Sequence, residues 1–218
     1  MARLFPSLMA ADLLNLASII TALDPYCDGF HVDIMDDHFV PNITFGADMT
    51  NAIAKQAQKP CWVHLMINKP ADFIEKLTLK QSSIITFHQE GCSNPEAIIT
   101  LIRGRQCKAG IALKPATPVS AIAHILSLID QVLIMSVEPG FSGQGYMASV
   151  ETKIKELVNL KKNKNLSFSI AIDGGINTHN ILMLKERGVD DFAIASALFG
   201  KADYKAECIA LNNIIKSS

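Results

Sequence analysis

Eight short apolar segments follow one another along the chain, each separated from the next by a longer amphipathic segment. Short apolar runs are typical of buried strands, whereas longer segments with apolar residues three and four positions apart are typical of helices. Strict alternation of the two implies a parallel sheet, because parallel neighbours need a crossover connection. Eight such units in succession predict an α/β fold in which the sheet closes into a (β/α)₈ TIM barrel.

The expected strands are residues 3–8, 29–35, 61–66, 83–88, 109–113, 131–137, 168–173 and 191–196. The expected helices are residues 12–23, 47–58, 70–77, 94–104, 117–126, 146–162, 178–188 and 204–216. Asn94, Thr117 and Thr178 are expected N-caps, and Gly188 is the expected C-terminal cap of its helix. No linker divides the chain, so residues 1–218 are expected to form a single domain. A doubly wound open sheet is the alternative, but it usually has a glycine-rich first turn, which is missing here.

Composition and charge exclude several classes of protein. The 218 residues are 49% hydrophobic and 19% charged, which is typical of a compact enzyme and not of a disordered chain. A net charge of −1 gives no general attraction to nucleic acid or to a membrane surface. No apolar run approaches the ~18 residues of a membrane span, and Pro6 and Asp12 interrupt the apolar start. Five scattered cysteines without a CxxC pair favour a cytoplasmic location.

Polar side chains stand near the C-terminal ends of the expected strands, where catalytic residues lie in a (β/α)₈ barrel. His31 and Asp33 end the second strand, His64 the third and Asp173 the seventh. Taken singly, each could be a hydrogen-bonded structural residue or a turn former. Together, two imidazoles and two carboxylates suit one borderline divalent cation. We expect Zn²⁺ first, with Fe²⁺, Mn²⁺ or Co²⁺ as alternatives.

Small residues follow the sixth, seventh and eighth expected strands. The segment 139–145 reads PGFSGQG, Gly174 and Gly175 follow Asp173, and 195–197 reads ASA. Small residues let backbone N–H groups approach an anion, and the loops after strands seven and eight are the usual phosphate site of this barrel. We therefore expect a phosphate site here rather than simple tight turns, with the loop after the sixth strand as a lid.

Other residues at the expected strand ends have two interpretations. Methionine there is either core filler or part of a water-poor rim over the site, and the residues concerned are Met9, Met35, Met66 and Met135. His88 and Lys114 end the fourth and fifth strands, where each either supports the site or has a structural or solvated role. Trp62 is expected to pack outward against the helices.

These motifs together resemble the ribulose-phosphate 3-epimerase family. The matching segments, in order along most of the chain, are PSLMAADLLN, HVDIMDDHFVPNITFG, HLM, ALKPATP, MSVEPGFSGQ and DGGIN. The resemblance implies a metal-dependent epimerase of pentose phosphate metabolism that inverts C3 of a ketose phosphate. It would interconvert D-ribulose 5-phosphate and D-xylulose 5-phosphate by two-aspartate proton transfer through a metal-stabilised enediolate. The resemblance also implies a homo-oligomer, a dimer or a hexamer.

The resemblance also implies roles for individual residues. The implied metal ligands are His31, Asp33, His64 and Asp173. Asp33 and Asp173 are the implied acid and base, and either can be the base for a given epimer. The implied substrate-binding residues are Ser7, His64, Gly140, Phe141, Ser142, Gly143, Asp173, Gly174, Gly175, Ala195 and Ser196. We expect dry surroundings to raise the pKa of a catalytic carboxylate toward the working pH.

Three residues depart from the family pattern, since Asp37, Ser142 and Ala195 stand where glycine is usual. Aspartate tolerates the left-handed conformation better than most residues, while the other two leave the substrate size open. One alternative is therefore a 3-epimerase of a longer ketose phosphate, such as D-allulose 6-phosphate. Decarboxylases and aldol-type synthases of the phosphate-binding barrels carry Asp-x-Lys-x-x-Asp, which is missing after Asp33. A sugar-phosphate-binding protein without catalysis would not need all four implied ligands.

Overall fold

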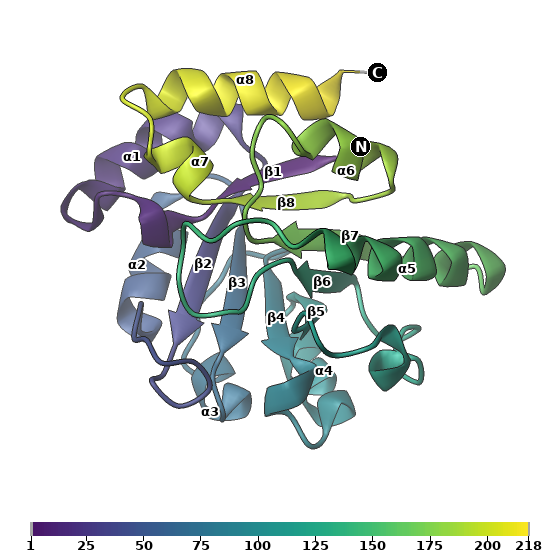
Figure 1. The fold of residues 1–218 in the computed structure, drawn as a ribbon. Coiled ribbons are helices and arrows are strands. Elements are labelled where there is room, and N and C mark those ends of the chain that lie inside the picture. The colour runs from purple at the N-terminus through teal and green to yellow at the C-terminus, as the bar shows by residue number, and fades with distance from the viewer. Residues whose placement is uncertain (1, 218) are drawn as a thin grey trace.

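The computed structural model describes residues 2–217, which form a (β/α)₈ barrel as predicted (Figure 1). The parallel strands are β1 (Arg3–Pro6), β2 (Phe30–Met35), β3 (Cys61–Met66), β4 (Ile84–His88), β5 (Lys108–Leu113), β6 (Gln131–Met135), β7 (Ser169–Asp173) and β8 (Asp191–Ile194). All eight predicted strands are therefore present, and their ends shift by two residues at most.

Helices surround the barrel (Figure 1). They are α1 (Leu16–Leu23), α2 (Ala47–Gln56), α3 (Pro70–Ile74), α4 (Pro95–Gly104), α5 (Glu151–Asn163), α6 (Ile181–Glu186), α7 (Ser196–Phe199) and α8 (Tyr204–Lys216). Short 3₁₀ turns are η1 (Leu8–Ala10), η2 (Leu13–Asn15), η3 (Asp24–Tyr26), η4 (Gln89–Gly91), η5 (Val119–Ile122) and η6 (Ala148–Val150). The predicted helix at 204–216 is confirmed at both ends, and Asn94 caps α4 by accepting the N–H of Ala97.

Several helix predictions were wrong in detail. Helix α1 begins at Leu16 rather than at residue 12, and α5 begins at Glu151 rather than at residue 146. Residues 117–126 form only the 3₁₀ turn η5 followed by further turns, not an α-helix. The buried residues Val119, Ile122 and Ile125 are three positions apart, which matches the three residues per turn of a 3₁₀-helix. Helix α6 begins three residues after Thr178, with Asn180 at its N-cap position, while Gly188 ends the segment in the left-handed conformation with φ +100°.

The strands pair in the order β1-β8-β7-β6-β5-β4-β3-β2. Within residues 2–217, a single parallel bridge between Ser7 and His31 closes the ring between β1 and β2. On the next pair of strands, Asp33 lies opposite His64. The place where the ring closes is therefore also the place where the predicted site residues of β2 and β3 lie.

Apolar side chains fill the inside of the barrel. This interior cluster consists of Phe5, Trp62, Ile84, Ala112, Leu133, Met135, Val137, Ala171 and Ala193. The prediction that Trp62 packs outward was wrong, because residues 62 and 64 share a face of β3 and His64 points inward. Trp62 contacts Phe5 edge to face, with ring centroids 5.2 Å apart.

A buried chain of hydrogen bonds crosses the barrel nearer the N-terminal ends of the strands. Trp62 Nε1–H donates to Thr86 Oγ1 at 2.9 Å, and the Thr86 hydroxyl donates to Gln131 Oε1 at 2.8 Å. Gln131 Nε2–H donates to Asp191 Oδ2 at 2.8 Å, and Arg3 donates two hydrogen bonds of 2.7 Å to the same carboxylate. Asp191 is fully buried, so these partners take the place of water in stabilising its negative charge.

Replacing Asp191 by alanine should lower the free energy of unfolding by about 3–5 kcal/mol, since Arg3 would lose its buried counter-ion. Urea denaturation measures the loss. Asp190→Ala is the matched control, because the Asp190 side chain is partly exposed and pairs with Lys161 and the N–H of Ile170. Equal losses in the two variants would contradict this role of Asp191.

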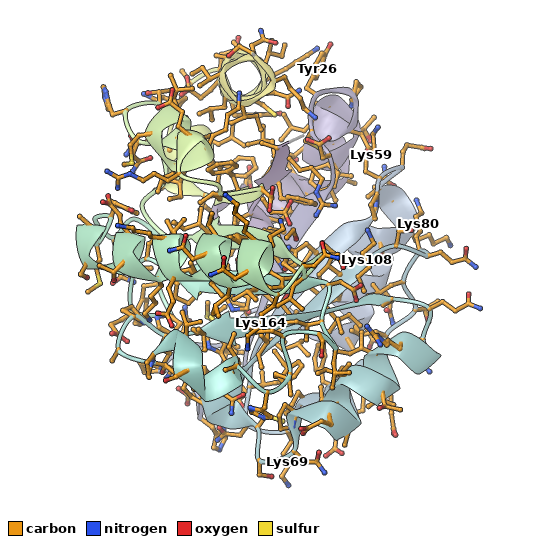
Figure 2. The ribbon with its side chains drawn as sticks, turned by 90° about the vertical axis from the view of Figure 1, so that its right-hand side faces the viewer. Tyr26, Lys59, Lys69, Lys80, Lys108 and Lys164 are labelled. Carbon is orange, nitrogen blue, oxygen red and sulfur yellow. The ribbon has the colours of Figure 1, made fainter. Side chains whose placement is uncertain are left out.

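Four lysines lie at the end of the barrel opposite the predicted site. Figure 2 labels Lys59, Lys80, Lys108 and Lys164 on the face turned to the viewer. The first two shortly precede β3 and β4, Lys108 begins β5, and Lys164 precedes β7.

Among the residues that the structure describes, no helix has both the length and the apolar character needed to cross a membrane.

Candidate active site

The four predicted metal ligands meet at the C-terminal end of the barrel. His31 and Asp33 come from β2, His64 from β3, and Asp173 from the last position of β7. One nitrogen or oxygen of each side chain lies within 4.8 Å of those of the other three. We call these four residues the ligand cluster. Their convergence follows from the alternation of side chains along strands that end at one rim.

Distances within the ligand cluster fit one divalent cation. Asp33 Oδ1 lies 2.9 Å from His31 Nε2 and 3.1 Å from His64 Nδ1. Asp173 Oδ2 lies 3.6 Å and 3.7 Å from the same two nitrogens. Two ligands that are each ~2.1 Å from one ion and roughly 90–120° apart are separated by about 3.0–3.6 Å. The four donors therefore have both the chemistry and the spacing of a cation site.

The charge of the ligand cluster also favours a cation. Both imidazoles are fully buried, and Asp33 and Asp173 are 2% and 15% exposed. Burial alone would lower the pKa of His31, yet the adjacent Asp33 and Asp173 raise this pKa to about 10. Two carboxylates in a dry site thus attract positive charge strongly.

The expected rise in carboxylate pKa was wrong for Asp33. Burial alone would raise the pKa of Asp33, but the charges and hydrogen bonds of His31 and His64 hold it well below its ordinary value. The expectation took only the burial of the carboxylate into account and neglected the two imidazoles that contact it. Asp33 is therefore a carboxylate at neutral pH.

A cavity opens beside the ligand cluster, and the predicted substrate-binding residues other than His64 line it. They are Ser7, Gly140, Phe141, Ser142, Gly143, Asp173, Gly174, Gly175, Ala195 and Ser196. Asp33 also lines the cavity, as do Met9, Met35, Met66 and Met135. The methionines thus line the site, whereas the imidazoles of His31 and His64 are fully buried and do not line the cavity. The substrate contacts themselves stay predictions.

Glycines shape the turn that follows β7. Gly174 and Gly175 have φ values of +115° and +64°, which favour glycine. A Cβ at Gly175 would lie 2.4 Å from the backbone nitrogen of Tyr146, so the loop after β6 packs directly on this turn. The hydroxyl of Ser136 donates to the carbonyl oxygen of Gly174 at 2.6 Å and fixes the turn. This support from Ser136 was not predicted from the sequence.

Two of the three departures from the family pattern fit the backbone, whereas the ψ of −101° at Ala195 lies outside the regions that residues with a side chain commonly adopt. Asp37 has φ +58°, the left-handed conformation that aspartate tolerates. Ser142 is outside the positive-φ region, and the neighbouring Gly143, with φ +82°, adopts it instead. Ala195 has φ −105° just before α7.

Hydrogen bonds from Ser7 and Asn42 join different parts of the candidate site. Ser7 Oγ–H donates to Asp33 Oδ2 at 2.7 Å. The side-chain amide of Asn42 donates to the carbonyl oxygen of Gly140 at 2.8 Å, which ties the loop after β2 to the loop after β6. The role of Asn42 was not predicted, because the pairing joins two loops far apart in the sequence.

His88 lies behind His64, and their Nε2 atoms are 2.9 Å apart. His88 Nδ1 is 3.1 Å from Glu90 Oε2. Burial lowers the pKa of His88 to about 4, so the ring is neutral at neutral pH. The ammonium of Lys114 lies 4.0 Å from the centre of the Phe39 ring and not in the cavity lining. Glu90 was not predicted as a site residue from the sequence, although it lies only two positions after His88.

Comparisons with known proteins agree with this geometry. The model of the Ribulose-phosphate 3 epimerase family matches residues 3–199. The ribulose-phosphate 3-epimerase of Treponema pallidum is 39% identical over 197 residues, which cover 90% of each chain. That of Mycobacterium leprae is 38% identical over 206 residues, covering 94% of this chain and 92% of the relative. The structure of a 3-hexulose-6-phosphate synthase superposes with a TM-score of 0.68 over 98% of this chain and 99% of the other, at 15% identity. That last likeness supports the barrel fold alone.

Proposed function

Because this chain belongs to the ribulose-phosphate 3-epimerase family, we propose that it interconverts D-ribulose 5-phosphate and D-xylulose 5-phosphate. Membership makes it an epimerase whose substrate is a sugar phosphate. One observation carries the proposed inversion by two aspartates: carboxylates from β2 and β7 line one cavity and share one ligand cluster. In the ring, β1 and β8 separate these two strands, so the aspartates approach the cavity from different sides.

Inversion of C3 needs a proton to leave one face of the carbon and another to arrive on the opposite face. Asp33 and Asp173 each direct one oxygen, Oδ1 and Oδ2 respectively, toward the imidazoles. The second oxygen of each remains for proton transfer. Asp33 Oδ2 accepts the hydrogen bond of Ser7 Oγ–H, which orients it. We therefore assign one face of the substrate to Asp33 and the other to Asp173.

His31, Asp33, His64 and Asp173 would hold the divalent cation. When bound, it would act as a Lewis acid that stabilises negative charge on the substrate oxygens next to C3. The mixed imidazole and carboxylate donors support Zn²⁺ as the first choice, with Fe²⁺, Mn²⁺ or Co²⁺ as alternatives.

The substrate phosphate is assigned to the glycine-rich end of the cavity. Gly174, Gly175 and Ser196 line this end together with residues 140–143 of the loop after β6. Their small side chains leave backbone N–H groups accessible to an anion. The four methionines that line the cavity would exclude water from the reacting carbon.

The direct test incubates the protein with D-ribulose 5-phosphate in heavy water and follows C3 by NMR. The expected product is D-xylulose 5-phosphate with a single deuterium at C3, because the returned proton comes from solvent. Heat-denatured protein is the control. Retention of the C3 proton and no xylulose product would reject the proposal. Faster turnover of D-allulose 6-phosphate would reassign the substrate to the longer sugar.

The homo-oligomeric state and the cytoplasmic location stay predictions. Size-exclusion chromatography with light scattering tests the first, and fractionation of cells tests the second. A monomer, or a protein recovered outside the cytoplasm, would contradict them.

A further inference from the structure

Two polar residues behind His64 have no part in the proton transfer described above. His88 ends β4 and is buried, and Glu90 lies in the following turn η4. Three side chains form a row: His64 Nε2 lies 2.9 Å from His88 Nε2, and His88 Nδ1 lies 3.1 Å from Glu90 Oε2. The other nitrogen of His64, Nδ1, faces the ligand cluster. The row therefore connects the outside of the barrel rim to a candidate metal ligand.

The Glu90 carboxylate fixes the direction of the hydrogen bonds in this row. Its Oε1 accepts the N–H of Lys114 at 2.7 Å and the hydroxyl of Thr117. Its Oε2 can only accept from His88, so Nδ1 of His88 carries a proton. His88 Nε2 then has a free lone pair and accepts from Nε2–H of His64. That leaves the lone pair of His64 Nδ1 for the cation, which would bind where Nδ1 otherwise donates to Asp33 Oδ1 at 3.1 Å, and this is the tautomer that a cation needs.

The other imidazole of the ligand cluster lacks such support. In the part of the chain that the structure describes, His31 Nδ1 is buried without a hydrogen-bond partner. Its ring is held by packing, edge to face against Trp62 with centroids 4.3 Å apart. Hydrogen bonds from outside the ligand cluster therefore fix the tautomer of His64 but not that of His31.

The two histidines of the row are shielded from water, whereas the Glu90 side chain is 20% exposed. The ring of Phe39 lies 4.8 Å from that of His88, and the ammonium of Lys114 lies 4.0 Å from the centre of the Phe39 ring. The hydrogen bond between the two imidazoles therefore lies in dry surroundings, where it is stronger than in water.

We propose that Glu90 is a positioning residue that sets, through His88, the tautomer and ring orientation of His64 and thereby strengthens cation binding. The inference rests on the cation site in the proposed function. It concerns affinity for the cation, and it is independent of which ketose phosphate the protein converts.

Glu90→Gln tests this with almost no change of shape. The carbonyl oxygen of the introduced side-chain amide must face the N–H of Lys114, so its NH₂ group would face His88 Nδ1. That reverses the row: His88 would carry its proton on Nε2, and His64 would be left with its proton on Nδ1. We expect Zn²⁺ and Co²⁺ to bind roughly 10–100-fold more weakly.

Two readouts other than turnover follow the effect. Titration of chelator-treated full-length protein with Zn²⁺ or Co²⁺ against a competing chelator gives the affinity. NMR of ¹⁵N-histidine-labelled protein shows which nitrogen of His88 carries the proton, expected to be Nδ1 in the wild type and Nε2 in the variant. Glu96→Gln is the matched control, because the Glu96 carboxylate is exposed on α4 and pairs with His124, away from the row.

Unchanged affinity for both cations in folded Glu90→Gln would overturn the proposal. So would a wild-type His88 with its proton on Nε2, a measurement that needs no variant and decides the matter if Glu90→Gln fails to fold. Failure of the wild type to epimerise D-ribulose 5-phosphate would reject the proposed substrate instead, and it would leave the cation affinities interpretable.

Discussion

Asp173→Asn should reduce epimerisation by roughly 10⁴-fold and leave the barrel folded. An amide cannot take or return the proton at C3, and it also replaces a charged ligand of the cluster with a neutral one. Asp173 ends β7 and is partly exposed to the cavity, so its replacement leaves the interior packing of the barrel unchanged. The measurement is the rate of xylulose 5-phosphate formation from ribulose 5-phosphate, with circular dichroism to verify folding.

The same variant carries a sharper expectation. With Asp33 intact, residual exchange of the C3 proton with heavy water should occur in only one of the two epimers, and neither should invert. Asp33→Asn should show residual exchange in the other epimer. Asp190→Asn, at the opposite end of the barrel, is the control and should retain wild-type turnover. Near-normal activity of Asp173→Asn, or equal exchange in both epimers, would remove Asp173 from its assigned face.

Removal of the cation should lower the rate at least about 10³-fold, which corresponds to ~4 kcal/mol of lost stabilisation of negative charge. The ligand cluster favours positive charge at its centre, since Asp33 and Asp173 both face it. The experiment dialyses the protein against a chelator, measures metal content, and then adds Zn²⁺, Co²⁺, Mn²⁺ or Fe²⁺ separately. Full activity of protein shown to be metal-free would contradict the assignment, and the ion that best restores the rate identifies the cofactor.

The barrel and its ligand cluster could be predicted from the sequence for a common reason. Strand periodicity is local, and it determines both the element order and the side of each strand on which a residue lies. His31 and Asp33 share one face of β2 because they are two positions apart, and parallel strands bring His64 and Asp173 to the same rim. The convergence of four side chains therefore required no knowledge of the packing.

The parts that escaped prediction depend on contacts between distant segments. Glu90 receives its hydrogen bonds from the loop after β5, and no local pattern indicates this. Asn42 supports Gly140 across two loops in the same way. The low pKa of Asp33 reflects two specific imidazoles rather than burial. Trp62 is different, since its position two residues before His64 already indicated an inward side chain.

The single bridge that closes the ring has a mechanical consequence. Among the described residues, other neighbouring strands share at least three paired positions, whereas β1 and β2 share one, between Ser7 and His31. The hydroxyl of Ser7 adds a hydrogen bond between the end of β1 and β2 by donating to Asp33. Ser7 thus helps to close the barrel and at the same time orients Asp33, the aspartate that we propose for one face of the substrate.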